Sequence, residues 1–157
     1  MEMLRRVMLS GFKSIKSMDL ELRPLNVLIG ANGAGKSNLI SFFKLLNEMM
    51  AGRLQLHIAT TGRAHSLLHF GPKVTSEIEA RLQFETVEGV NTYEMTLEFA
   101  VGDILVCSDE KLSQNLSSSE LPYWSNQFSS ASNESRINEV RDLKNTMGIR
   151  LRQLMNN

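Results

Sequence analysis

The chain has 157 residues, about the length of one domain, of which 42% are hydrophobic and 22% charged. These proportions are ordinary for a globular protein and exclude a disordered or fibrous chain. Lysine and arginine together number 17, as do aspartate and glutamate, so the formal net charge is +0. The protein therefore has no overall electrostatic field that would attract it to nucleic acid or to an anionic membrane.

Cysteine content and the N-terminal residues bear on the compartment. Cys107 is the only cysteine, which excludes an internal disulfide and every zinc site built on several cysteines. Residues 1–12 lack the apolar region of a signal peptide, and no stretch reaches the length that spans a bilayer. We therefore predict a cytoplasmic protein that does not enter the membrane.

The first predicted elements are strands within residues 4–29. Apolar and polar residues alternate around Leu9 and again around Leu20, as expected of strands covered on one face. The later run Val27-Leu28-Ile29 is continuously apolar, which predicts a strand buried on both faces. This third strand would lead directly into Gly30.

The middle of the chain predicts one helix and an antiparallel meander. Apolar residues recur every three or four positions from 39 to 50, so an amphipathic helix should begin near Lys36. Residues 51–72 predict a short helix and a loop. In residues 73–108, alternating runs separated by tight turns predict three antiparallel strands. Residues 1–112 would thus form one lobe.

The last third divides into two segments of different composition. Residues 113–135 are rich in serine and asparagine, which predicts an irregular loop. Residues 136–157 place apolar side chains at helical spacing, so we predict an amphipathic helix there.

Residues 30–37 contain the strongest functional motif, because they match the phosphate-loop pattern G-x-x-x-x-G-K-S. Glycines allow successive backbone N–H groups to turn inward around phosphates. The ammonium of Lys36 would reach the β- and γ-phosphates, and the hydroxyl of Ser37 would coordinate Mg²⁺. The predicted phosphate-binding residues are Gly30, Ala31, Asn32, Gly33, Ala34, Gly35, Lys36, Ser37 and Asn38.

The segment from Leu9 to Ile15, with the sequence LSGFKSI, and the segment from Leu25 to Gly33 together resemble the opening of SMC/RecF-like ABC-type ATPases. In that group a strand ends in a Phe-Lys-Ser turn, and a later loop with Asn-Gly before Gly-Lys-Ser begins the nucleotide site. The resemblance implies that Lys13 and Ser14 lie near the adenine and ribose and that Asn32 lines the γ-phosphate side. The alternative is that Lys13 is a solvated charge at a strand end.

Members of this group hydrolyse ATP as dimers, so the resemblance implies a homodimer or a complementing ATPase half as partner, and it allows DNA as another. Their Ser-Gly signature loop is not found, because residues 112–115 lack the required glycine. Asp109 and Glu110 imitate the acidic pair that holds Mg²⁺, but their strand should be antiparallel and peripheral. We predict solvated carboxylates at a strand end.

Three histidines, His57, His65 and His69, lack the spacing and partners of a metal site and are predicted to be loop residues. Other classes of P-loop protein are disfavoured by missing motifs. A kinase would need a lid with paired arginines, and a GTPase an Asn-Lys-x-Asp sequence; neither is present.

The predicted fold is an α/β P-loop NTPase lobe: a mixed sheet with the phosphate-loop helix, plus an antiparallel meander, forming an incomplete part of a larger ATPase. The predicted function is binding of ATP and Mg²⁺, with hydrolysis requiring further C-terminal elements. The alternative is a non-catalytic module that senses ATP and docks on an ATPase through the Leu143 and Leu151 face.

Overall fold

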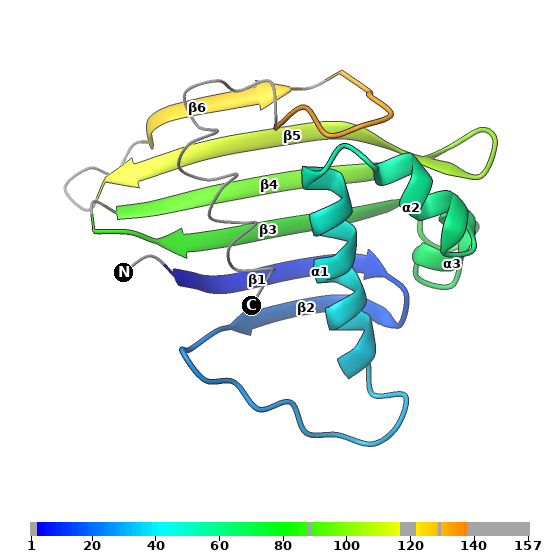
Figure 1. The fold of residues 1–157 in the computed structure, drawn as a ribbon, viewed down its shortest axis with the longest axis horizontal. Coiled ribbons are helices and arrows are strands. Elements are labelled where there is room, and N and C mark those ends of the chain that lie inside the picture. The colour runs from blue at the N-terminus through cyan, green and yellow to red at the C-terminus, as the bar shows by residue number, and fades with distance from the viewer. Residues whose placement is uncertain (1–2, 88, 117–121, 129, 138–157) are drawn as a thin grey trace.

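The computed structural model describes residues 3–87, 89–116, 122–128 and 130–137. Within them, six strands form one antiparallel sheet in the order β2-β1-β3-β4-β5-β6 (Figure 1). The strands are β1 (Met3–Phe12), β2 (Ile15–Glu21), β3 (Glu77–Glu85), β4 (Gly89–Ala100), β5 (Ile104–Leu116) and β6 (Pro122–Phe128). The helices are α1 (Lys36–Met50), α2 (Leu54–Thr60) and α3 (Arg63–Leu67). No described helix is long and apolar enough to cross a membrane.

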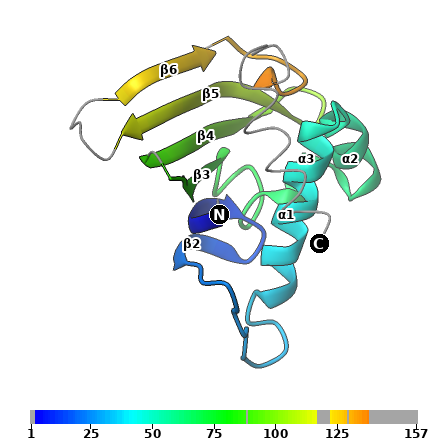
Figure 2. The ribbon, with the colours of Figure 1, turned by 60° about the vertical axis from the view of Figure 1, so that its left-hand side comes forward.

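The helices lie on one face of the sheet, and Figure 2 shows α1 packed against that face. Alternation along the strands directs every second side chain toward the helices. Val7, Leu82 and Tyr93 are fully buried there, and the ring of Phe12 meets that of Phe42 on α1 edge to face at 5.8 Å. The core therefore lies between the sheet and α1, as the predicted one-sided strands require.

The predicted buried strand at Val27-Leu28-Ile29 is not formed in the described structure. Residues 22–35 form a connection without strand pairing, and the side chains of Val27 and Ile29 are 72% and 90% exposed. A strand needs a neighbouring strand to accept its hydrogen bonds, and the described sheet offers none beside this segment. The apolar run is therefore an uncovered surface next to the phosphate loop.

The sheet also differs from the predicted mixed sheet, because all strand pairs described are antiparallel. The meander of residues 73–108 is confirmed as antiparallel, with Ile78 opposite Leu97 and Leu97 opposite Cys107. If residues 27–29 had paired with a parallel strand, the sheet would have been mixed.

The predicted loop over residues 113–135 is partly strand. Strand β5 continues to Leu116, and residues 122–128 form β6, which pairs with β5. Cross-strand pairing on β5 therefore overrides the weak strand preference of serine and asparagine. The predicted helix of residues 136–157 lies, apart from its first two residues, outside the described part of the chain.

Residues 132–137 fasten the helical layer to the sheet. The Glu134 carboxylate accepts hydrogen bonds from the backbone N–H groups of Leu54 and Gln55, at 2.8 and 3.1 Å. It thereby satisfies two donors that the first turn of α2 leaves without partners. The Gln55 side-chain amide donates to the carbonyl oxygens of Leu105 and Asn133. One short segment thus joins α2 to β5.

Gly11 provides a test of the close packing of β1 against the start of β3. Its φ is +74°, and a Cβ there would lie 2.2 Å from the Glu77 carbonyl oxygen. Gly11→Ala should therefore lower the free energy of unfolding by about 2–4 kcal/mol, from left-handed strain plus overpacking. Gly52→Ala is the matched control, because Gly52 has φ +67° but open space around it. Urea denaturation should show at most about half the loss for the control.

Candidate nucleotide-binding site

The phosphate loop is built on the N-terminus of α1. Helix α1 begins at Lys36, as predicted, and its N-cap residue Gly35 has φ 93°. Gly33 has φ 87°, so both glycines occupy a region closed to most side chains. The Gly35 carbonyl oxygen accepts hydrogen bonds from the N–H groups of Asn38 and Leu39. The loop therefore enters the helix through a left-handed turn that leaves N–H groups of the first helical turn available to an anion.

Lys36 lies across this loop. Its ammonium donates to the carbonyl oxygens of Gly30 and Ala31, the latter at 2.8 Å. A side chain at Gly30 would crowd this arrangement, since a Cβ there would lie 3.2 Å from Ala34 Cβ and 3.8 Å from the ammonium nitrogen. The ammonium is thus held at the loop, where it could exchange these carbonyl acceptors for the oxygens of an incoming phosphate.

The remaining predicted loop residues are solvent-facing. Ala31, Asn32, Ala34 and Ser37 are exposed, and Ser37 stands at the first turn of α1. A serine hydroxyl oxygen is a hard ligand of the kind that Mg²⁺ prefers. Ser37 is the residue of this site that would hold Mg²⁺.

The structure brings the predicted Ser14 to the loop. The Asn38 side-chain amide donates to Ser14 Oγ at 2.6 Å, and a Cβ on Gly35 would lie 3.4 Å from the same oxygen. Lys13, its neighbour in the β1–β2 turn, has φ 49° and places its ammonium 5.5 Å from the centroid of the Phe12 ring. Two segments that are distant in the sequence thus meet at the start of α1.

A cleft of about 510 Å³ opens between β2 and the phosphate loop. Lys36 and Ser14 line it, together with apolar side chains from β2 and from the exposed run that includes Ile29. No aspartate or glutamate is among the described residues that line it. The cleft can bind phosphate and an apolar group, but its lining provides no carboxylate to activate water.

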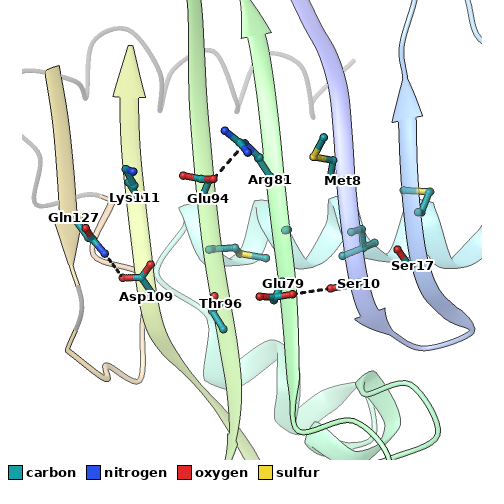
Figure 3. Close-up of a pocket in the computed structure, with 14 residues that line it drawn as sticks. Met8, Ser10, Ser17, Glu79, Arg81, Glu94, Thr96, Asp109, Lys111 and Gln127 are labelled. Atoms are coloured by element: carbon teal, nitrogen blue, oxygen red, sulfur yellow. Dashed lines mark hydrogen bonds and ion pairs between the residues drawn. The ribbon is translucent and has the colours of Figure 1, made fainter. Parts of the chain in front are cut away.

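Asp109 and Glu110 do not lie at a strand end, contrary to the prediction, because β5 extends to Leu116. Asp109 faces the side of the sheet that the helices leave open, where it accepts a hydrogen bond from Gln127 at 3.1 Å. Figure 3 shows this face, with paired polar side chains such as Arg81 and Glu94. It forms a shallow hollow of about 500 Å³ that is separate from the phosphate loop.

Glu110 points to the opposite, helix-covered face and is only 2% exposed. Its carboxylate accepts hydrogen bonds from Tyr93 Oη and Ser135 Oγ, both at 2.6 Å, and from the Arg136 N–H at 2.7 Å. Burial and the nearby carboxylate raise the pKa of Tyr93 well above its ordinary value. Glu110 is therefore a structural carboxylate, and the strand direction predicted for it is confirmed.

The histidines lie in more ordered places than predicted. His57 is in α2 and His65 in α3, while His69 is buried and follows α3. His65 Nδ1 lies 2.6 Å from Asp103 Oδ2, and this contact lowers the pKa of Asp103. Among the residues described, no cluster of three metal-binding side chains occurs.

Sequence reasoning missed the segment Leu67 to Phe70, which supports the Lys13 turn. The Lys13 N–H donates to the Leu67 carbonyl oxygen at 2.8 Å, and the His69 N–H donates to the Gly11 carbonyl oxygen at 2.9 Å. Irregular backbone of this kind has no periodicity to detect, so only the fold reveals it.

The α1 helix and the glycine loop at its N-terminus, beside the sheet, define the class as a P-loop domain. A family model described as "AAA domain, putative AbiEii toxin, Type IV TA system" matches residues 25–151. The chain belongs to this AAA domain family.

A solved structure gives independent support for the fold. A chain from structural work on the ATP-driven dimerisation and DNA-stimulated activation of SMC ATPases superposes with a TM-score of 0.52 and is 19% identical. The match covers 90% of this chain and 77% of the other. No curated protein gives a significant match. The structural likeness therefore supports the α/β fold.

Proposed function

We propose that this chain binds Mg-ATP at residues 30–38 and is the nucleotide-binding lobe of an SMC/RecF-like, ABC-type ATPase in the cytoplasm. The observation that carries the proposal is the position of Lys36, whose ammonium lies at the carbonyl groups of Gly30 and Ala31 on the N-terminus of α1. A helix N-terminus and one ammonium group together favour a polyphosphate ligand. Ser37 would hold the magnesium ion that bridges the phosphates.

We further infer that hydrolysis needs a complementing α/β portion. The run from Leu25 to Ile29 is exposed although its residue types favour a buried strand. A parallel strand beside this run would cover it, and an acidic pair at the end of that strand would face Lys36 and Ser37. The cleft lacks such carboxylates among its described lining residues, which supports slow or absent turnover by this chain alone.

Titration calorimetry tests the binding proposal directly. Mg-ATP added to the folded chain should release heat and saturate one site, and removing Mg²⁺ with EDTA should weaken the affinity because the metal neutralises phosphate charge. Absence of binding by protein with intact circular dichroism would refute the proposal.

A turnover assay separates the incomplete-lobe proposal from a self-sufficient enzyme. Phosphate release by the chain should not exceed that of a Lys36→Ala variant. Rapid release that depends on Lys36 would show that the complementing portion is unnecessary. Adding a chain that supplies the acidic strand should restore hydrolysis, whereas a purely ATP-sensing module would bind that chain without gaining activity.

Dimerisation and DNA binding follow as parts of the same proposal. Light scattering with and without Mg-ATP measures the first, and fluorescence anisotropy of labelled duplex DNA measures the second. Because the net charge is +0, we expect any DNA binding to be local and weakened by salt.

A further inference from the structure

Phe70 has two features that ordinary packing does not explain. It is 80% exposed, and its φ is 56°, a left-handed conformation that is an outlier for a bulky side chain. Strain of this kind persists where the surroundings impose it, and it is found often at ligand sites. Here the surroundings are a tight turn, closed by a hydrogen bond from the Gly71 N–H to the Leu68 carbonyl oxygen at 3.1 Å.

The Phe70 ring is supported by a buried neighbour. The ring of His69 meets it edge to face with centroids 4.4 Å apart. His69 is itself fixed, because its Nδ1 donates to the Lys13 carbonyl oxygen at 2.7 Å. Lys13 also has a left-handed φ, 49°. Two strained non-glycine residues are therefore connected through one buried imidazole. The exposed Phe70 ring thus has a rigid support.

This unit is connected to the phosphate loop. Ser14 follows Lys13 in the same turn and accepts the hydrogen bond from Asn38 at the start of α1. Ser14 also lines the cleft that contains Lys36. The phosphate loop, the β1–β2 turn and the Phe70 turn thus follow one another along the surface. A nucleotide with its phosphates at Lys36 would bring its base to the Phe70 turn if its sugar extended along this surface, past Ser14 and Lys13.

We propose that Phe70 is the surface on which the base of the bound nucleotide stacks; the inference rests on the proposed function and deepens it. An exposed aromatic ring on a rigid turn loses little conformational entropy when it stacks against a base. Every base presents a π-face, so stacking tolerates either purine. Phe70 therefore provides affinity for ATP and GTP alike and little discrimination between them.

The experiment compares nucleotides with a ligand that has no base. ATP, GTP and inorganic tripolyphosphate, each with Mg²⁺, are titrated into the wild-type chain and into the Phe70→Ala and Phe70→Trp variants. Phe70→Ala should lower the affinity for ATP and GTP by roughly ten- to hundredfold and leave the affinity for tripolyphosphate unchanged. Phe70→Trp should retain nucleotide affinity. Val101→Ala is the matched control, because Val101 is 98% exposed in the β4–β5 turn, and its affinities should equal those of the wild type.

A spectroscopic measurement complements the affinities. A Phe70→Trp variant that also carries Trp124→Phe has a single indole. Its fluorescence should be quenched by ATP and not by tripolyphosphate. Unchanged ATP affinity in Phe70→Ala would overturn the inference, as would an equal loss for tripolyphosphate, which would indicate a disturbed loop. If the wild-type chain binds neither ligand, the proposed function itself fails, and the two failures are thus distinguished.

Discussion

Replacing Lys36 with alanine is expected to lower the affinity for Mg-ATP by about a hundredfold or more, because one ammonium is lost from charge-assisted hydrogen bonds to phosphate. Lys36 is the side chain that already lies at the loop carbonyl groups, donating to Gly30 and Ala31. No other described lining residue of the cleft except Lys16 carries a positive charge. Binding of tripolyphosphate should fall by a similar factor, since the lost contacts are to phosphate.

The control for this substitution is Lys44→Ala. Lys44 is an exposed residue of the same helix and lies outside the cleft lining, so its removal changes the net charge equally. Calorimetry should show a small decrease that disappears at high salt, because exposed charges act through a screened field. Wild-type affinity in Lys36→Ala would show that the nucleotide does not use this loop.

Replacing Glu110 with alanine is expected to lower the free energy of unfolding by about 3 kcal/mol or more, measured by urea denaturation. Three donors would lose their acceptor in a buried site: the Tyr93 hydroxyl, the Ser135 hydroxyl and the Arg136 N–H. An unsatisfied buried donor costs its full desolvation. The segment that fastens α2 to the sheet should loosen at the same time.

Asp109→Ala provides the neighbouring control, since Asp109 faces the open side of the sheet (Figure 3). Its cost should be below about 1 kcal/mol, as for other solvent-facing polar groups. The double variant Glu110→Ala, Tyr93→Phe should lose less free energy of unfolding than the sum of the two single variants, because Tyr93 and Glu110 share one hydrogen bond. Equal small effects at positions 109 and 110 would contradict the structural role of Glu110.

Asp109 and Glu110 show where a local sequence pattern stops predicting the role of a residue. Both follow an apolar run, and their sequence context resembles that of a magnesium-binding pair. Strand pairing decides their roles, because alternate residues of β5 face opposite sides. Asp109 is directed to solvent and Glu110 to the core. Neither side chain is among those lining the cleft beside Lys36.

The amino-acid sequence by itself determined the elements that depend on local interactions. The glycines at 33 and 35 permit the left-handed turn into α1, and the three- and four-residue spacing after Lys36 specifies which side of the helix is buried. Alternation in residues 77–100 likewise specifies the inward face of β3 and β4. These features repeat over short distances, so they can be predicted without a fold.

The tertiary structure alone decided what depends on contacts between distant segments. Residues 27–29 have the composition of a buried strand, yet they remain exposed because no described strand pairs with them. Ser14 reaches Asn38 only because the β1–β2 turn folds against the start of α1. Likewise, the His69–Phe70 turn is joined to Lys13 only because His69 Nδ1 donates to the Lys13 carbonyl oxygen, 56 residues away in the sequence. Such contacts depend on the packing of the whole domain, and no local pattern encodes them.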